Sequence, residues 1–478
     1  MGDRKTLGRV CAVAGCALYW PLLRRTGHFY VLGGHEGAAG GELPWLAAFL
    51  LLVAAFAIGA FEAEGRGRVG KSRRMAGAIL LSLFPAQAAL KLAGLFLAPV
   101  GSLAILLAAA DLFLFAACLV ELTYMWASWL VFEPRGSSEV VAIVSFGLSF
   151  LAKTVLALPA PAGAAVYSLL PAASVAFWLA CGGPARCREG VGREGEARGT
   201  DAAAWRTVWA LSAFLVVCGV VRGFSAEPLS GRPVEASVTA QDMVSVAFCA
   251  LLLVANLASG DRGSFFRLAW SALVLLVFFG LLLAASGAGN YGTGRQLLVI
   301  GRTCLGLLLW IVLTRLARGR AAGGAGLVCL VFLLVDVVSS LVGYIAVPCA
   351  LDASGIDAER VATTLPLVIS FVLIAVSVVL VNALGRAPFG APAAEAPASP
   401  AVTSSGEGAF AAYGLTEKEE AVASLLARGN SQKRTAEMMG ISVSAVQSHA
   451  KAVYRKLGIH SRQELVDMAS GGWGRSDR

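Results

Sequence analysis

Residues 443–457, close to the C-terminal end, combine an apolar face with a polar and basic one. Four apolar residues recur at spacings of four, three and four, which places them on one side of a helix: Val446, Ala450, Val453 and Leu457. The other side carries hydroxyl, amide and basic groups: Ser444, Gln447, Ser448, Lys451 and Arg455. Amides can pair with base edges and cations with phosphates, so this face has the chemistry of nucleic-acid recognition.

Four short helices are predicted around this face. Each begins after a residue that can cap a helix N-terminus: Thr416, Ser431, Ser442 and Ser461. Glu419 and Glu464 complete capping boxes at the first and last of these positions. Gly429, Gly440 and Gly458 stand where the first three helices end. A short helix, a turn with glycine and a longer helix form a helix-turn-helix layout.

The charge of this region fits the same chemistry. From Arg428 to Arg462 there are seven basic residues and one acid, Glu437. Such a patch is the electrostatic footprint of phosphate binding. A basic helical bundle that binds a protein is the alternative interpretation.

The same residues resemble the LuxR-type helix-turn-helix over about fifty positions. The family's elements L-T-x-R-E, S-x-x-x-I-A, I-S-x-x-T-V-x-x-H and K-L-G-x-x-S-R-x-E-L have collinear, ungapped counterparts at 415–419, 431–436, 441–449 and 456–465. The chain departs from them at Lys418, Thr435 and Ala445, where the family has arginine, isoleucine and threonine.

The resemblance implies that the third helix enters the major groove of double-stranded promoter DNA. The expected base contacts are Gln447, Ser444, Ala445 and Ser448, with Gln447 first because its amide can pair with adenine. The expected phosphate contacts are Lys433, Lys451, Arg455 and Lys456. For His449 a packing or phosphate role is favoured over base reading. A homodimer formed through the fourth helix is also implied, and RNA polymerase is a candidate partner.

The preceding 384 residues have a membrane composition. The chain is 57% hydrophobic and 14% charged, with a mean hydropathy of +0.73. Twelve apolar runs are long enough to cross a bilayer as helices. They are roughly 10–30, 43–61, 76–97, 101–124, 138–158, 162–182, 205–222, 239–259, 265–287, 296–315, 325–347 and 361–384.

Charge placement predicts the topology. Residues 1–384 carry 28 of the 39 Lys+Arg residues; 19 of these lie in loops and span ends on the side of the N-terminus, against 6 on the other side. By the positive-inside rule both termini are cytoplasmic, in a multi-pass protein of the inner (cytoplasmic) membrane. An even number of spans also places the DNA-binding segment in the cytoplasm.

The spans divide six and six around a polar loop, 183–204. This layout, with Gly67-Arg68-Val69-Gly70-Lys71 between spans two and three, resembles the major facilitator transporters and their D-R-x-G-R/K signature. Gly67 stands where that signature has aspartate, which weakens any inference of transport. The resemblance implies a bundle of two six-helix halves, 1–182 and 205–384.

Six ionisable residues lie inside the predicted spans: Lys91, Asp111, Glu121, Lys153, Arg302 and Asp336. A charge at mid-membrane costs roughly 2.5–3.5 kcal/mol, so it faces a cavity or a partner. Lys91, Asp111, Glu121, Arg302 and Asp336 are therefore candidates for a ligand pocket between the halves. Structural pairing, for instance of Lys91 with Asp111, is the alternative.

Between these parts, residues 385–412 are rich in Pro, Ala, Ser and Gly and predict a linker. The predicted organisation is all-α: a transmembrane domain at 1–384, the linker, a four-helix DNA-binding domain at 413–470 and a tail at 471–478. As a coil, the linker would span on the order of 30 Å.

Cofactor and enzyme chemistry are not indicated. The ten cysteines include no CxxC pair and there are only four histidines, so no metal site is expected. Residues 65–72 satisfy the phosphate-loop pattern GxxxxGK[ST], but they lie between two spans, away from any strand. We expect no cofactor and no enzymatic activity.

Three functions are compatible with this organisation. The first is a membrane-bound one-component transcription regulator that senses an unknown small molecule or an envelope signal. The second is a transporter with an attached regulatory domain, in which Asp111, Glu121 and Asp336 would matter for coupling. The third is a passive membrane anchor for a constitutive DNA-binding domain.

Overall fold

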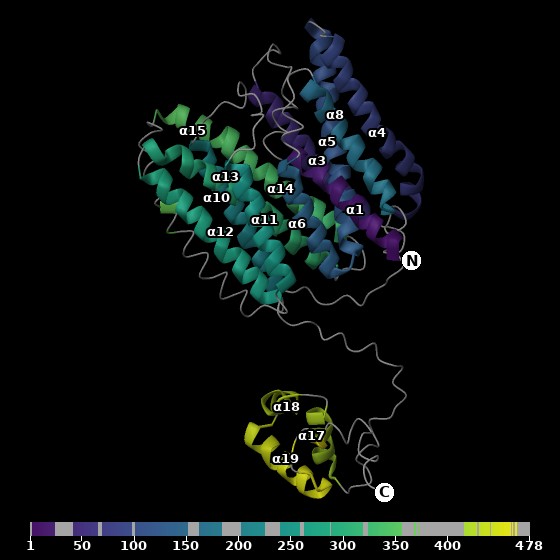
Figure 1. Ribbon diagram of the computed structural model, residues 1–478, viewed down its shortest axis with the longest axis vertical. Helices are drawn as coiled ribbons and strands as arrows, with labels where there is room; N and C mark the ends of the chain where they lie inside the picture. The colour runs from purple at the N-terminus through teal and green to yellow at the C-terminus, as the bar shows by residue number, and fades with distance from the viewer. Residues whose placement is uncertain are drawn as a thin grey trace. The chain divides into compact units, whose positions relative to one another are not determined.

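The chain forms two compact units, Met1–Pro392 and Ala393–Arg478 (Figure 1). The division falls inside the predicted linker, whose residues lie outside the described part of the chain. This computed structural model describes residues 2–23, 42–65, 69–97, 101–151, 162–183, 202–224, 240–258, 262–286, 288–318, 324–355, 368–369, 371, 415–427, 430–439, 441–459, 461 and 464–465.

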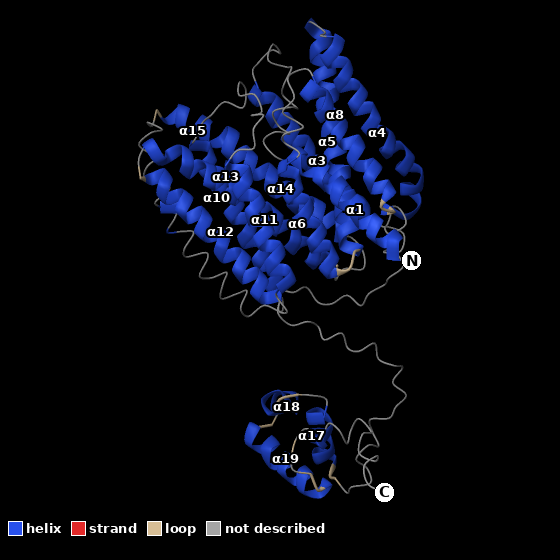
Figure 2. Ribbon diagram, in the orientation of Figure 1, coloured by secondary structure: helices blue, strands red, loops and turns tan. Residues whose placement is uncertain are grey.

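Every described element is a helix, as the sequence predicts (Figure 2). The first unit begins with α1 (Gly2–Tyr19) and the 3-10 helix η1 (Trp20–Leu23). Then follow α3 (Glu42–Gly65), α4 (Val69–Leu97), α5 (Gly101–Phe132), α6 (Arg135–Leu151), α8 (Ala162–Ala180), α10 (Ala202–Phe224), α11 (Ala240–Ala258), α12 (Arg262–Ala285), α13 (Ala288–Ala317), α14 (Gly324–Leu341), the π-helix η2 (Val342–Ala346) and α15 (Val347–Ser354).

Eleven of the twelve predicted spans coincide with these helices, and several helices extend beyond the predicted spans. The first helix begins at Gly2 and its 3-10 continuation ends at Leu23, directly before the two arginines that interrupt the predicted run. α5 continues to Phe132, and the α14 helix continues through η2 to Ser354. The twelfth span, 361–384, lies outside the described residues except for 368–369 and 371.

Five helical segments of the described chain are long and apolar enough to cross a bilayer: Thr6–Leu23, Leu43–Glu64, Gly101–Phe132, Gln296–Ala317 and Gly324–Ser354. Shorter apolar stretches lie in α4, α6, α8, α10, α11 and α12. This is the helix content of a multi-pass membrane protein.

The helices of the first unit repeat one packing scheme. In the first six spans, α1 packs on α6, and both α3 and α4 pack on α5. Six spans later, α10 packs on α14 and η2, while α11 and α12 pack on α13. Thus α4, α5 and α8 gather on one side and α10, α12 and α13 on the other (Figure 1). The recurrence supports the predicted division into six and six.

Several helix pairs join these halves, and the two largest of them follow the same repeat. α3 packs against α14, and α6 packs against α11. α3 and α14 are the second and eleventh spans, and α6 and α11 are the fifth and eighth. Adding six to the lower number of either pair and subtracting six from the higher number gives the other pair. The contacts between the halves therefore obey the same two-fold relation as the contacts within them.

The π-helix η2 lies at a close crossing with α10. A Cβ built on Gly219 would lie 2.5 Å from the backbone oxygen of Ser339, and one on Gly343 would lie 2.7 Å from the backbone oxygen of Gly219. Such approaches require glycine, and small residues allow membrane helices to pack backbone to backbone. η2 thus sits where two backbones are in direct contact, next to Ser339.

The C-terminal unit has three described helices around one core: α17 (Glu417–Ala427), α18 (Gln432–Met439) and α19 (Val443–Leu457). Its buried hydrophobic residues are Val422, Ala423, Leu426, Ala436, Val446, Ala450, Val453, Leu457, Ile459 and Leu465. Only Glu464 and Leu465 of the predicted fourth helix are described as helical. Thr435, where the LuxR pattern has isoleucine, is fully buried.

The Gly219 crossing yields a stability prediction. The substitution Gly219→Ala forces α10 away from the Ser339 backbone, because neither backbone can move aside as a flexible side chain can. We expect the melting temperature of the purified full chain to fall, with an overpacking cost of about 1–3 kcal/mol. Gly59→Ala is the control, since its Cβ meets nothing within 4 Å. Equal melting temperatures for the two variants would contradict the crossing.

Candidate DNA-binding surface and buried polar groups

The helix α19 is fixed at both ends by the residues predicted from the sequence. The Ser442 hydroxyl accepts a hydrogen bond from the backbone N–H of Ala445, at 3.2 Å, and caps the N-terminus. Gly458 ends the helix in the left-handed conformation, at φ 70°. Between these caps, all four apolar residues of the predicted inner face are buried: Val446, Ala450, Val453 and Leu457.

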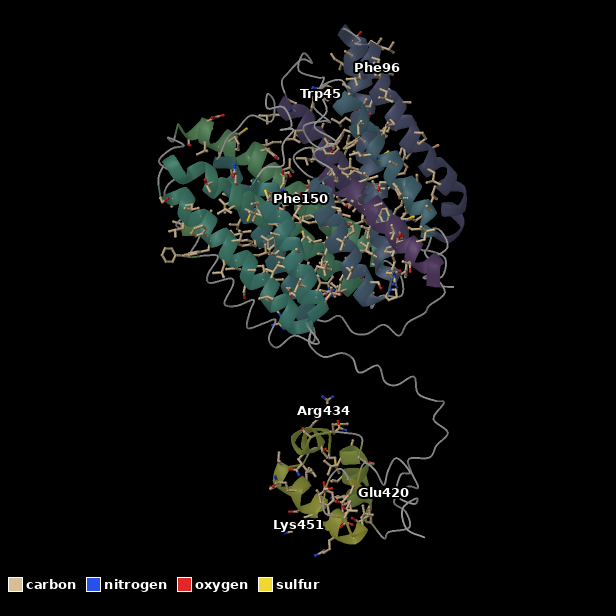
Figure 3. The ribbon with its side chains drawn as sticks, viewed as in Figure 1. Trp45, Phe96, Phe150, Glu420, Arg434 and Lys451 are labelled. Carbon is tan, nitrogen blue, oxygen red and sulfur yellow. The ribbon has the colours of Figure 1, made fainter. Side chains whose placement is uncertain are left out.

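The outer face of α19 is exposed as predicted. Ser444, Gln447, Ser448, Lys451 and Arg455 are all exposed, and Ala445 and His449 are half-buried at its edges. Lys451 projects away from the body of the domain (Figure 3). The five exposed side chains include two cations and no acid. This outer face can therefore donate hydrogen bonds and attract an anion along the whole helix.

A contact between helices orients Gln447. Its Nε2 donates to Oε1 of Gln432, the first residue of α18, over 3.3 Å. This hydrogen bond holds the Gln447 amide near the turn between α18 and α19. At the start of α19, the Ser444 hydroxyl lies 2.9 Å from that of Ser442.

Lys456, which the sequence predicts to contact phosphate, pairs with an acid of the same domain. Its ammonium forms an ion pair with Glu419, with Nζ 2.6 Å from Oε2. Glu419 also accepts the backbone N–H of Thr416 at 2.8 Å, while the Thr416 hydroxyl accepts that of Glu419 at 3.4 Å, which confirms the capping box. The carboxylate thereby links the start of α17 to the end of α19.

This link lowers the pKa of Glu419 to about 2, from an ordinary value of 4.5. The hydrogen bond from Lys456 is the largest cause, followed by the one from the Thr416 backbone. Because Glu419 and Lys456 are 37 residues apart, no local sequence pattern indicates their pairing. The sequence predicted the cap but not the ion pair.

One further cation belongs to this surface. Arg434 on α18 was not among the predicted contacts, yet its side chain is exposed and projects from the domain (Figure 3). Its place in the basic run from 428 to 462 was the available signal. Lys433 is helical, but its side chain lies outside what the structure describes.

In the membrane unit, four of the predicted ionisable residues form two separate pairs. Lys91 on α4 bonds to Asp111 on α5 with Nζ 2.9 Å from Oδ2, and Gln87 donates to the other oxygen at 3.2 Å. This is the structural pairing that the sequence left open. Glu121 lies half-buried on α5, and Lys153 is outside the described residues.

The second pair lies in the other half. Arg302 on α13 donates from Nη2 to Oδ1 of Asp336 on α14, at 3.0 Å, and from Nε to the hydroxyl of Ser339 at 3.3 Å. The Ser339 hydroxyl in turn donates to the backbone oxygen of Leu215 on α10. The predicted pocket residues therefore divide between the two halves and do not form one cluster.

Polar contacts tie the halves at the end predicted to be cytoplasmic. Arg315 on α13 lies 2.7 Å from Glu139 on α6, counted from Nε to Oε1. Arg318, just after α13, donates to backbone oxygens at the end of α5 and to the Ser138 hydroxyl. Glu64 accepts the backbone N–H of Gly326 at the start of α14, where a helix dipole favours an anion.

The folds described above define a helix-turn-helix DNA-binding domain joined to a multi-pass helical membrane domain. Residues 414–469 match the family described as "Bacterial regulatory proteins, luxR family", so the C-terminal domain is a LuxR-type helix-turn-helix, as predicted. Among solved structures, the crystal structure of the E. coli fucose:proton symporter FucP is similar, at 12% identity and a TM-score of 0.43, over 80% of this chain and 98% of that one. No curated protein matches the chain.

The Glu419 link makes the C-terminal domain sensitive to acid. A carboxylate whose pKa is lowered by folding stabilises the fold above its ordinary pKa, and that stabilisation is lost as the pH falls from about 4.5 toward about 2. In thermal unfolding of the fragment 393–478, we expect Glu419→Gln to be less stable than wild type at neutral pH. The difference should shrink through this window, and a pH-independent difference would contradict the ion pair.

Proposed function

We propose that the chain is a membrane-bound one-component transcription regulator of the inner membrane, with both termini in the cytoplasm. Residues 1–384 form the sensor, 385–412 the linker and 413–470 the DNA-binding domain. The membrane domain responds to an unknown ligand or envelope signal and thereby controls sequence-specific DNA binding. On DNA the domain acts as a homodimer, and RNA polymerase is its downstream partner.

The exposed face of α19 is the observation that carries this proposal. Its amide and hydroxyl groups are those that read base edges, and its cations are those that contact phosphates. A LuxR-type domain covers these residues, and the same chain carries a multi-pass membrane domain. The two parts together make control of transcription from the membrane the most economical function.

The proposed contacts on DNA follow from this face. Gln447, Ser444, Ala445 and Ser448 contact bases, while Lys433, Lys451, Arg455 and Lys456 contact phosphates. Lys456 can contact a phosphate only if its ammonium also keeps its ion pair with Glu419 or if that ion pair breaks. We therefore rank Lys456 below Lys451 and Arg455 as a phosphate contact.

Two other functions remain as alternatives. In a transporter with an attached regulator, uptake into vesicles should depend on Asp336, because an intramembrane carboxylate can carry the coupling charge. In a passive anchor, residues 385–478 alone should reproduce the full regulatory response. The internal pairing of Lys91 and Asp111 favours a structural role for that pair over coupling.

The contacts on DNA predict two different losses. Lys451→Ala removes a phosphate contact, so affinity should fall about equally for all sequences and the salt dependence should decrease by about one unit of slope. Gln447→Ala removes a base contact, so discrimination at one base pair should fall by about 1–3 kcal/mol. Binding of fragment 393–478 to selected DNA sequences at several salt concentrations measures both. Identical losses in the two variants would contradict the assigned roles.

The regulatory proposal is tested by transcript profiling with a panel of small molecules. Wild type is compared with the variant Gln447→Ala/Lys451→Ala, and with Glu420→Ala as a control away from the α19 face. We expect one molecule to switch a discrete group of genes in the wild type and the control only. If the same genes differ between strains whatever is added, the membrane domain is an anchor.

A further inference from the structure

On one face of helix α13, an accessible stripe runs along the first half of the helix and then stops. Between Thr293 and Gly306, seven described positions are exposed or half-exposed, and five of them share this face: Gln296, Val299, Arg302, Thr303 and Gly306. Directly after Gly306, all residues from Leu307 to Thr314 are buried. A face turned to lipid would stay exposed along its length, so this stripe borders a space that ends inside the bundle.

Gly306 lies at the inner end of this stripe, beside open space. Among the residues that the structure describes, nothing lies within 4 Å of a Cβ built there, although its chain neighbours Leu305 and Leu307 are fully buried. Arg302 and Gly306 are four residues apart and share one face. The open volume therefore begins beside the Arg302 side chain.

An aromatic cluster closes the bundle beyond Gly306. The Trp310 ring packs against Phe332 of α14 at 4.8 Å between centroids, against Trp20 at 5.7 Å and against Tyr19 at 6.0 Å. All four residues are at most 7% exposed. Beyond this cluster lie the contacts of Arg315 and Arg318, so the bundle is closed on the predicted cytoplasmic side.

The Arg302–Asp336 pair is the only described intramembrane pair in which both partners keep substantial exposure, at 18% and 23% of their side chains. For comparison, Asp111 keeps 5%. Arg302 uses Nε and Nη2 for Ser339 and Asp336, and within the described residues Nη1 has no acceptor and is not buried. Asp336 likewise keeps Oδ2 accessible.

We propose that this space is a ligand site and that its ligand is a small zwitterion of the amino-acid type. The carboxylate binds the free edge of the Arg302 guanidinium, which suits a planar anion, and the ammonium binds Oδ2 of Asp336. The ligand enters from the end that carries Gln296, which the predicted topology places outside the cell. Its side chain occupies the volume beside Gly306.

Charge balance selects this ligand class. The pair is neutral as it stands, and an ion with net charge would leave one unbalanced charge among apolar helices. A zwitterion adds equal and opposite charges, each next to its complement. A neutral polyol also preserves the balance, but it gains only neutral hydrogen bonds, which are weaker than charge-assisted ones.

The probes are the free proteinogenic amino acids, each with its carboxamide and its N-acetyl derivative. The full chain is purified in lipid nanodiscs, and its melting temperature is measured with each probe. We expect at least one free amino acid to raise the melting temperature, while its two capped derivatives do not. If no free amino acid raises it, or if the capped forms or a polyol raise it equally, the proposal is wrong.

Variants place the site. Gly306→Leu fills the space and keeps both charges of the ion pair, and we expect it to weaken amino-acid binding at least about tenfold while folding normally. Gly59→Leu is the matched control, because Gly59 also has open space around its Cβ and lies on another helix. Arg302→Lys keeps the positive charge but loses the planar guanidinium, which can bind a carboxylate through two N–H groups. This variant should therefore also weaken binding. Unchanged affinity in Gly306→Leu would overturn the site.

The inference rests on the proposed sensor function only for its biological meaning, and the two fail separately. If an amino acid binds at Gly306 but leaves transcripts unchanged, the sensor function is wrong and the site stands. If transcripts respond to a molecule without both charges, the sensor function stands and the site assignment is wrong.

Discussion

The pairing of charges inside an apolar bundle is the constraint on which the membrane domain depends. An isolated ion among these helices would be costly, and breaking a buried pair costs more than the pair contributes. Lys91 and Asp111 meet this requirement completely, because Gln87 also occupies the carboxylate. Arg302 and Asp336 meet it only in part, since each keeps an accessible atom. The difference separates a structural pair from one that can still bind a partner.

The two-fold relation between the halves explains why such a site lies between helices and not in a loop. The halves meet through several helix pairs, among them the two equivalent pairs α3 with α14 and α6 with α11. Polar ties at one end, such as Arg315 with Glu139, hold the halves together there. The Gly306 stripe, which borders the proposed site, begins near the opposite end of α13, at Gln296.

Sequence patterns predicted the features that depend on neighbours along the chain. The Ser442 and Thr416 caps, the Gly458 terminus and the inner face of α19 all follow from spacings of three or four residues. Contacts across the fold were beyond these patterns. The Glu419–Lys456 pair joins residues far apart, and the open space at Gly306 depends on what neighbouring helices leave unfilled. Arg302 and Asp336 were identified as candidates because charges are rare in spans, but their pairing needed the fold.

The linker limits how a signal can reach the DNA-binding domain. A linker of the composition of residues 385–412, rich in Ala, Gly and Pro, would transmit little force, so rigid pulling on α19 is a poor mechanism. A ligand must instead bind two states of the bundle unequally, because equal affinity shifts nothing however tight it is. The ties at Glu139 and Glu64 supply one element that could differ between two such states, since both join one half to the other. In the proposed function, opening them would change the end of the bundle that the sequence predicts to be cytoplasmic, and with it the freedom of the tethered domain to bind DNA.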